Sequence, residues 1–510
     1  MTSLATPPTT ATTNEHAEPG PRQHVAATVA VAVLGVFVTY MPINGVSGAL
    51  TTIASATDAS TAQLQWISDA YVIPMAAAVL SGGVFGDLYG RRRIFSLGLG
   101  LTALGGLIAA LAAVLGSAAL PTLLGGQAVS GLGAGLLLPT TLALITHAVP
   151  DPRARARYIG LWAGGVSAGL ALGPLLSGAV LEFAGWGWIF VPTAVLALGT
   201  LVYGHLRLPE SKNPEGRRLD WPGQITAALA IAALIFGVIE GGAQGWSSTY
   251  AMTGLTVGIL ALAAFIVVER RAPAPLMDLR IFTTPGFGVA AFASLIALFS
   301  IVGITFLLSL YLGSVHGFSA LEIGIRLFFM AGLSAVCNPL IGRLMGRIQP
   351  LLLLTTGLAL AALAALLIAQ TGPTTSFLDL IWRLAVFGVS VALMLTSVTV
   401  VSVNAVPWNL AGMAAASSTA LRQFGGALGP AILGAIYTSC LADGHTPTTA
   451  LHTALITTSI LLAIGVLGCL AVLAATRRHP SHHSGMSHAR GQRISRPPSK
   501  DASARQTVLS

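Results

Sequence analysis

Few side chains inside the apolar stretches of this chain can carry a charge, so those few limit the chemistry it can perform. Asp69, Glu182, Glu240 and His147 lie at or near the ends of apolar runs, whereas Arg422 lies between apolar residues. A carboxyl group that is partly desolvated in a cavity can bind and release a proton near neutral pH, so Asp69 is the first candidate for proton coupling. The alternative is that the acids are solvated at an interface and that Arg422 reaches the interface with its long stem.

Two amides deep in apolar runs, Asn44 and Asn338, could present polar groups to a cavity. Hydrogen bonding between helices is the alternative interpretation. The chain has no G-x-S-x-G, HxxxD or GxxxxGK[ST] motif, and Cys337, Cys440 and Cys469 form neither a CxxC pair nor a Cys/His cluster. We therefore expect no catalytic residue, no bound metal, no cofactor and no ATP-driven step.

The most specific motif is a loop at 86–93 with the sequence GDLYGRRR. Gly86 and Gly90 allow two helix ends and a tight turn to approach closely. Asp87 can accept charge-assisted hydrogen bonds, and Arg91 and Arg92 follow it in the sequence. We expect an ionic cluster here that holds one conformation shut and breaks in another.

The composition fits a membrane protein. Of 510 residues, 54% are hydrophobic and only 8% charged, and the mean hydropathy is +0.80, whereas soluble domains carry about 25% charged residues. The tail at 477–510 holds seven Lys/Arg and one Asp, and so supplies +6 of the net charge of +9. These values exclude a soluble, a disordered or a nucleic-acid-binding protein.

Apolar runs long enough to cross a bilayer predict fourteen helices. Their ranges are 25–48, 66–85, 94–115, 120–146, 158–181, 188–206, 223–240, 250–268, 287–312, 327–343, 351–370, 378–404, 412–437 and 451–475. With the N-terminus inside, most Lys and Arg residues fall in inner loops and tails, whereas Arg326 and Arg383 fall near outer helix ends. This asymmetry predicts a multi-pass protein of the cytoplasmic membrane with both termini in the cytoplasm.

An internal repeat with an offset of 256 residues predicts the architecture. The GDLYGR sequence at 86–91 corresponds to GRLMGR at 342–347, with four of six positions identical. We expect a cytoplasmic N-terminal segment (1–24), a six-helix bundle (25–206), a two-helix insert with its flanking loops (207–286), a second six-helix bundle (287–476) and a basic tail (477–510). Both terminal segments should be disordered. Two parallel repeats around a site at the membrane midplane are a transporter plan.

The same offset relates two glycine-rich helices. Small residues spaced along one helix face allow close packing, and proline favours a kink. The fifth span carries Gly160, Gly169, Gly173, Pro174 and Gly178. The thirteenth carries the corresponding Gly425, Gly429, Pro430 and Gly434. We expect both to serve helix packing and kinking.

Together these motifs resemble the major facilitator superfamily over nearly the whole chain. The loop at 86–93 looks like the signature between its second and third helices, and the glycines of the fifth span are similar to the signature of its proton-driven exporters. Three further segments look like the fourteen-helix drug:proton antiporter family: QWISDAY at 65–71, LDWPG at 219–223 and RQFGG at 422–426. The resemblance implies export of small toxic molecules against inward proton flow.

Two departures from that family concern charge. The family's first helix usually carries an acid, whereas the segment 38–44 has none; Gln127 stands where the fourth helix usually has an arginine. A buried charge is costly without a partner. The absence of both the acid and the arginine therefore leaves neither charge unpaired in the membrane. Under the 256-residue offset Arg383 is equivalent to Gln127, so the second bundle keeps a charge at the position where the first bundle has none. Asn44, Asp69, Gln127, Asn338, Arg383 and Arg422 are therefore the candidates for coupling or for the substrate cavity.

The sequence thus predicts a monomeric, non-enzymatic exporter of drugs or antibiotics that works by alternating access and is driven by the proton gradient. Its expected partners are the lipid bilayer and a small-molecule substrate, without nucleic acid. An uncoupled facilitator or importer with a narrow substrate range on the same fold is the alternative.

Overall fold

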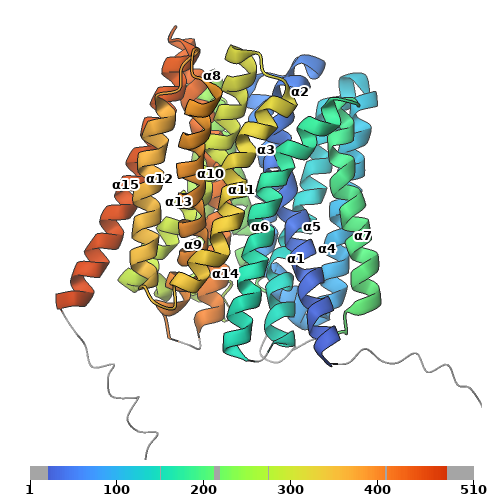
Figure 1. Ribbon diagram of the computed structural model, residues 1–510, viewed down its shortest axis with the longest axis vertical. Coiled ribbons are helices and arrows are strands. Elements are labelled where there is room, and N and C mark those ends of the chain that lie inside the picture. The colour runs from blue at the N-terminus through green and yellow to red at the C-terminus, as the bar shows by residue number, and fades with distance from the viewer. Residues whose placement is uncertain (1–20, 150, 212–218, 274, 408–409, 479–510) are drawn as a thin grey trace, which may run out of the picture.

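The computed structural model describes residues 21–149, 151–211, 219–273, 275–407 and 410–478, and in these ranges every regular element is a helix (Figure 1). Helices satisfy their backbone hydrogen bonds internally, which an apolar membrane requires. The α-helices are α1 (Pro21–Gly45), α2 (Leu50–Thr57), α3 (Thr61–Tyr89), α4 (Arg91–Leu111), α5 (Ala119–Ala148), α6 (Pro152–Leu181), α7 (Val191–Arg207), α8 (Trp221–Gln244), α9 (Thr249–Arg271), α10 (Pro285–His316), α11 (Ala320–Leu344), α12 (Pro350–Ala369), α13 (Phe377–Asn404), α14 (Ala411–Ala442) and α15 (Pro447–Arg478). Short 3-10 turns are η1 (Val46–Ala49), η2 (Ala112–Val114), η3 (Gly116–Ala118), η4 (Trp186–Phe190) and η5 (Leu279–Thr283).

These helices supply thirteen crossings within the described residues, and a fourteenth if the bent helix α3 counts as one span. Thirteen spans are long and apolar enough to cross a membrane, and the first combines α1, η1 and α2 (Val25–Thr57). The fourteenth is α3, which bends by 54° between Thr61–Val79 and Ser81–Tyr89. A Ser-Gly-Gly sequence at 81–83 follows the bend, and helices kink readily at such residues. The predicted all-α membrane fold is therefore confirmed.

Helix boundaries differ from the sequence prediction at both ends of the chain. α1 begins at Pro21, not at 25, and α15 continues to Arg478, beyond the predicted end of the second bundle. Residues 1–20 and 479–510, for which we expected disorder, lie outside the described residues. The predicted domain boundaries remain predictions.

Helices α1–α7 and α10–α15 form two bundles that share most of their internal contacts. In the first, α1 packs against α5, α6 and α7, α3 against α5, and α4 against α5 and α7. In the second, α10 packs against α13, α14 and α15, α11 against α13, and α12 against α13 and α15. These two lists coincide under the 256-residue offset, so the sequence repeat is also a repeat of structure.

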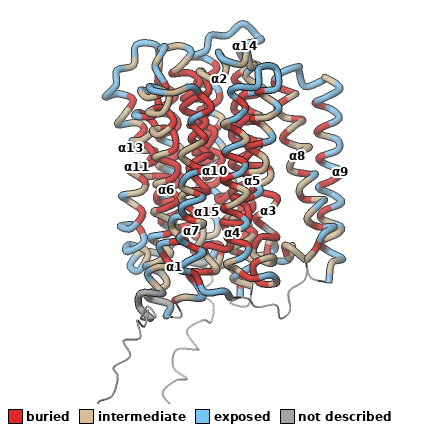
Figure 2. The backbone as a smooth tube through the Cα atoms, turned by 90° about the vertical axis from the view of Figure 1, so that its right-hand side faces the viewer, coloured by how far each residue is buried: buried red, intermediate tan, exposed pale blue. Residues whose placement is uncertain are grey.

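The bundles meet along two seams, which we name by their helices: the α6/α11 seam and the α3/α14 seam. The inserted helices α8 and α9 pack against each other, and α8 also packs against α3 and α14. Figure 2 shows α8 and α9 as a layer at one edge of the molecule, with α9 mostly exposed. The insert therefore covers the α3/α14 seam and makes the two seams unequal.

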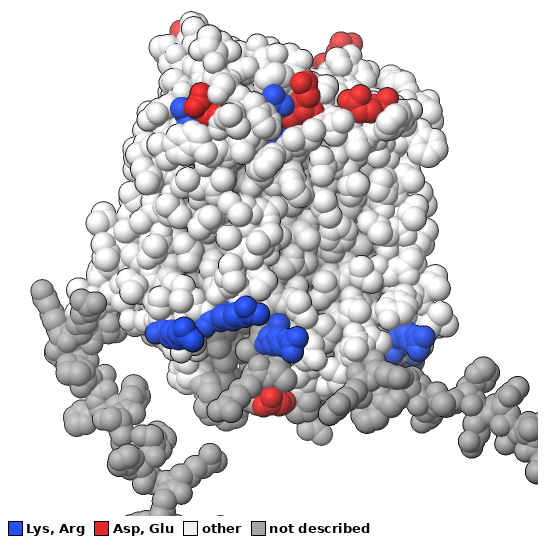
Figure 3. Space-filling view, in the orientation of Figure 1, with Lys and Arg blue, Asp and Glu red and all other residues white. Residues whose placement is uncertain are grey.

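Charge is separated along the long axis. On the face shown in Figure 3, most Lys and Arg lie near the end where the grey terminal segments leave the molecule. Most Asp and Glu, with a few Lys and Arg, lie near the opposite end, and the band between them shows no charge. An uncharged belt flanked by charged ends is the surface that a bilayer requires.

Candidate functional site

The two seams are packed tightly at one end of the molecule. On the α6/α11 seam, a Cβ added to Gly178 would lie 2.6 Å from the Ala320 carbonyl oxygen and 2.6 Å from Leu321 Cα. A Cβ on Gly324 would lie 2.6 Å from the Pro174 carbonyl oxygen. Distances below 3.0 Å leave no room for a side chain, so these glycines bring the two helix backbones into direct contact.

The equivalent end of the α3/α14 seam is closed in the same way. Gly434 of α14 packs directly on the Gln65 side chain of α3. Between the first helices of the bundles, the Ser309 hydroxyl donates to the Ser47 carbonyl oxygen, and Gly313 packs on Thr51. This end, formed by α2 and the last turns of α6, α10 and α14, is therefore sealed.

The opposite end of both seams is open. Helical spacing places Gly160 on the same face of α6 as Pro174 and Gly178, and Gly342 on the same face of α11 as Gly324. Neither Gly160 nor Gly342 has an atom within 4 Å of a built Cβ, and neither has Gly412 at the start of α14. The expectation that Gly160 serves helix packing is wrong for this conformation, because the bundles diverge at this end.

The remaining motif glycines pack within their own bundles. Gly169 approaches the Phe37 carbonyl oxygen of α1, and a Cβ there would lie 2.8 Å away. A Cβ on Gly429 would lie 2.6 Å from the Phe299 carbonyl oxygen of α10. Gly173 packs on Met41 and Gly45 of α1, Gly425 packs on Leu295 of α10, and Pro430 is buried in α14. Gly169 corresponds to Gly425 and Gly173 to Gly429 under the 256-residue offset, so equivalent glycines pack α6 on α1 and α14 on α10.

A polar cluster joins the two bundles at mid-depth. The Tyr40 hydroxyl of α1 donates to Gln423 Oε1 of α14 at 3.2 Å, and Gln423 Nε2 donates to Met75 Sδ of α3 at 3.1 Å. Arg422 is 6% exposed, its guanidinium interacts with the Tyr40 hydroxyl, and its Nε has no hydrogen-bond partner. Arg422 therefore does not reach the interface as the alternative interpretation supposed.

Asp69 lies on α3 in the α3/α14 seam, between the turns that contact α14 through Gln65 and Val72. It is 0% exposed, and neither of its carboxyl oxygens has a hydrogen-bond partner. The interpretation of Asp69 as a solvated interfacial residue is wrong. A buried carboxyl group without a counter-ion is costly, so its position requires a functional explanation.

Asn338 bridges three helices. Its Nδ2 donates to Ser167 Oγ of α6 at 2.6 Å, and its Oδ1 accepts from Thr396 Oγ1 of α13 at 2.9 Å. Ser334 Oγ lies 3.3 Å from Ser167 Oγ on the same seam. Ser167 and Thr396 were not singled out by sequence reasoning, because nothing in their local sequence distinguishes them from other hydroxyls in membrane helices.

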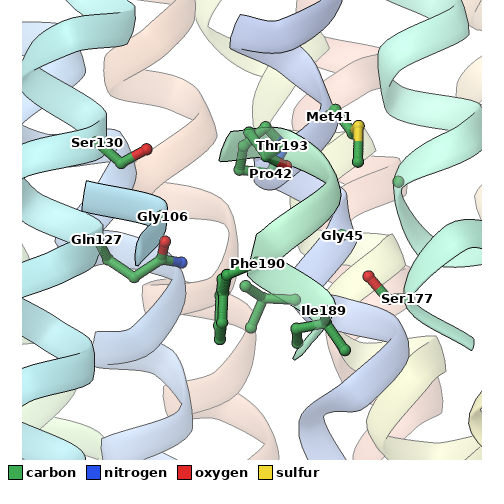
Figure 4. A pocket seen from close by; sticks show the side chains of 12 residues that line it. Met41, Pro42, Gly45, Gly106, Gln127, Ser130, Ser177, Ile189, Phe190 and Thr193 are labelled. Carbon is green, nitrogen blue, oxygen red and sulfur yellow. The ribbon is translucent and has the colours of Figure 1, made fainter. Parts of the chain in front are cut away.

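Asn44 and Gln127 lie inside the first bundle and not between the bundles. Asn44 Nδ2 lies 3.5 Å from the Leu170 carbonyl oxygen, and Gln127 Nε2 lies 3.4 Å from the Ile67 carbonyl oxygen. Gln127 lines a cavity of about 20 Å³ together with Ser130 and Ser177 (Figure 4). A cavity of this size holds about one water molecule, so it is too small for a drug.

Arg383 lies six residues from the first residue of α13, Phe377. Its Nε and Nη1 are buried without a hydrogen-bond partner, and the guanidinium carbon lies 5.6 Å from the centre of the Trp382 ring. On α11, Arg326 lies 3.8 Å above the centre of the Phe318 ring. An aromatic ring can stabilise a cation that lies above its face.

The 86–93 loop is an ionic cluster. Arg91 Nη2 donates to Asp87 Oδ1 at 2.9 Å. Gly90 has φ of +108°, a conformation that favours glycine. Glu210, which follows α7, accepts from the Arg92 backbone N at 3.1 Å and lies 3.7 Å from Arg93 Nε. Sequence reasoning missed Glu210, because only the fold brings the end of α7 to this loop.

The insert carries a second polar junction at the same end. Asp220 Oδ1 accepts from the Gly223 backbone N at 2.9 Å, and Glu269 Oε2 accepts from the Met277 backbone N at 3.0 Å. In the loop beyond, the hydrogen bond from the Arg280 side chain holds the pKa of Asp278 below its usual value. These contacts cap α8 and hold the segment that follows α9 against the end of α9. The described residues contain no cluster of three or more His, Cys, Asp or Glu side chains that could hold a metal ion.

Comparison with known proteins finds one family model and several bacterial relatives that match most of this chain. The family model of the Major Facilitator Superfamily matches residues 32–430. The multidrug resistance protein Stp of Mycobacterium tuberculosis is 34% identical over 413 residues, which cover 80% of this chain and 75% of Stp. The multidrug efflux pump LfrA of Mycolicibacterium smegmatis is 31% identical over 422 residues, 82% of each chain.

One further bacterial resistance protein and one solved structure are also similar to this chain. The methylenomycin A resistance protein of Streptomyces coelicolor is 29% identical over 422 residues, which cover 82% of this chain and 87% of that protein. A crystal structure of the human organic anion transporter MFSD10 (TETRAN) matches with a TM-score of 0.59 at 18% identity, covering 89% of this chain and all of that one. At this identity the likeness concerns the fold alone.

Proposed function

The chain belongs to the major facilitator superfamily, and from this premise we propose that it exports small toxic organic molecules, antibiotics among them, across the cytoplasmic membrane. The relatives Stp and LfrA are named for multidrug resistance and efflux, and a third for resistance to methylenomycin A. The superfamily consists of transporters and not enzymes, and one chain carries both bundles, so we propose that a monomer is the working unit.

The observation that carries the mechanism is the unequal closure of the seams. Contact at Gly178 and Gly434 and separation at Gly160 and Gly412 describe one state of an alternating-access cycle. The open end is the end that bears most Lys and Arg (Figure 3), which is the cytoplasmic end by the positive-inside rule. Both termini are then cytoplasmic, and the structure faces inward, ready to receive a substrate from the cell.

The 86–93 loop acts as the latch for the opposite state. In this inward-facing state Asp87 pairs with Arg91 of the next helix, and Arg92 and Arg93 engage Glu210, so these contacts remain within the first bundle. When the inner ends of the bundles approach each other, the same groups face the start of α14. Their charge-assisted hydrogen bonds can then hold the cytoplasmic end shut.

The proton gradient is the energy source, and Asp69 is the coupling group. The first helix has no acid, and Asp69 is a fully buried carboxyl group in a seam that must open and close. Opening the sealed end exposes Asp69 to the outside, where protons are abundant, and the inward-facing state buries it among apolar atoms. Burial among apolar atoms favours the protonated form of a carboxyl group, so Asp69 that binds a proton from outside keeps it on return to the inward-facing state. Substrate that enters from the open cytoplasmic end then has to displace this proton into the cell.

Efflux from living cells tests this proposal. Cells that express the wild type should expel ethidium and show raised resistance to an antibiotic panel, and a protonophore should abolish both. Asp69→Asn should lose protonophore-sensitive efflux at unchanged membrane abundance, whereas Glu182→Gln, at an exposed position, should behave as the wild type. Efflux that continues undiminished with the protonophore would instead favour the uncoupled facilitator. Two observations support that alternative: the first helix has no acid, and Gln127 stands where the family usually has an arginine.

A further inference from the structure

Among the charged residues that the structure describes in the second bundle, Arg422 lies farthest from the nearer end of its helix. It lies eleven residues from the first residue of α14, Ala411, and twenty from the last, Ala442. At about 1.5 Å per residue it is roughly 16 Å along the helix from the open end. A charge at this depth costs several kcal/mol in lipid unless a partner or a polar cavity receives it.

No acidic side chain of the described residues receives this charge. The ion pairs found there join Arg91 to Asp87, Arg93 to Glu210 and Arg280 to Asp278, all in loops or at helix ends. Asp69, the buried acid of the α3/α14 seam, has no partner at either oxygen. The cluster around Arg422 supplies only neutral groups, namely the Tyr40 hydroxyl and the Gln423 amide.

The surroundings of Arg422 place it between the bundles. Gly425 and Gly429 direct one face of α14 onto α10, and Gln423 directs the adjacent face onto Met75 of α3. Arg422 lies between these two faces and meets Tyr40 of α1. A Cβ on Gly412, ten residues before Arg422 and nearer the cytoplasmic end of α14, would meet no atom within 4 Å.

We propose that Arg422 binds the acidic group of an organic anion, so that the preferred cargo is an apolar molecule with a carboxylate, sulfonate or phenolate. This inference rests on the proposed export function and adds the substrate class to it. A guanidinium offers a planar fork of donors that matches two oxygens of one acidic group. Its buried Nε is a donor without a partner, and the Tyr40 hydroxyl, which donates to Gln423, helps to position the guanidinium. The apolar side chains of the seam then contact the body of the molecule.

Direct binding separates this inference from the export function. Purified protein in lipid nanodiscs is titrated against 5-carboxyfluorescein, an aromatic anion, and rhodamine 6G, a related cation, with fluorescence polarisation as the readout. The wild type should bind carboxyfluorescein, and Arg422→Gln should bind it about 10- to 100-fold more weakly, as expected for loss of a hydrogen bond to a charged group. Arg422→Lys should fall between them, because it keeps the charge and loses the fork.

Control measurements identify the cause. Arg271→Gln removes the same charge from an exposed position at the end of α9 and should bind carboxyfluorescein as the wild type does. Rhodamine 6G should bind Arg422→Gln no more weakly than it binds the wild type. Thermal unfolding of each variant shows whether weaker binding reflects a damaged fold, and a partial rescue by Arg422→Lys supports the direct contact.

The outcomes are distinct. Equal binding of carboxyfluorescein by the wild type and Arg422→Gln would overturn the anion site, as would a wild type that binds rhodamine 6G and not carboxyfluorescein. Arg422-dependent binding without transport of either dye would support the anion site and contradict the exporter. Transport of rhodamine 6G alone would leave the exporter intact and refute the substrate class.

Discussion

Substituting Gly178 by alanine should disturb the sealed end of the α6/α11 seam. The added Cβ would lie 2.6 Å from the Ala320 carbonyl oxygen and 2.6 Å from Leu321 Cα. Both atoms belong to the backbone of α11, so no side-chain rotation can relieve the clash. Since carbon atoms rest at about 3.5–4.0 Å, the two helices must separate by roughly 1 Å. Overpacking of this kind costs about 1–3 kcal/mol.

Because the clash exists only when the outer end is closed, its cost falls on the inward-facing state. A shift of about 1–3 kcal/mol changes the ratio of two states by roughly 5- to 150-fold. Gly178→Ala should therefore populate an outward-open state and slow transport. Gly160→Ala is the matched variant: its Cβ meets nothing within 4 Å in this state, so it should leave the inward-facing state undisturbed.

Spin labels at Glu182 and Asp443, which are exposed at the outer ends of the two bundles, measure the effect by electron–electron double resonance after the native cysteines are replaced. Gly178→Ala should lengthen the distance distribution, and Gly160→Ala should leave its shorter component at least as populated as in the wild type. The reasoning fails if Gly178→Ala gives the wild-type distribution together with wild-type transport.

Three further substitutions test other parts of the account. Asp87→Asn should lower transport about tenfold at unchanged membrane insertion, because it weakens a charge-assisted hydrogen bond; normal efflux by this variant would refute the latch. Gly90→Ala should lower the unfolding temperature by a few degrees, since φ is +108° and the added Cβ would lie 2.6 Å from Glu210 Oε1; unchanged unfolding would show that the loop relaxes. Asn338→Ala should cost about 1–3 kcal/mol of stability, because it removes hydrogen bonds to the buried Ser167 and the partly buried Thr396; thermal unfolding in detergent measures this, and a stability equal to the wild type would mean that water replaces the amide.

Sequence reasoning predicted the parts of the fold that depend on local composition. A membrane-spanning helix is recognised by its own apolar residues, and the repeat is recognised by its offset, so the number and order of the helices follow from the chain alone. The pairing of α3 with α14 and of α6 with α11 depends on how the two bundles face each other, which no local pattern records. The missed role of Glu210 has the same cause.

The candidate site was only partly predictable for a related reason. Arg422 and Asp69 could be recognised as unusual from their types, because charged residues are rare in apolar runs. Their burial could not be predicted, since a long side chain can reach the interface unless neighbouring helices prevent it. Asn44 faces α6 and not the seam, and only the rotation of α1 within its bundle decides this. Gly160 shows a further limit, because its contacts depend on the conformational state.

Active uptake into everted membrane vesicles tests the central claim most directly. Respiration acidifies the lumen of such vesicles, so a proton-driven exporter should accumulate carboxyfluorescein, rhodamine 6G or ethidium inside them. Wild-type vesicles should accumulate at least one of these dyes, stop on addition of a protonophore, and lose part of the pH gradient when the dye is added, whereas Asp69→Asn vesicles should do none of these. Accumulation that persists with the protonophore, or that Asp69→Asn supports as well as the wild type, would contradict the account.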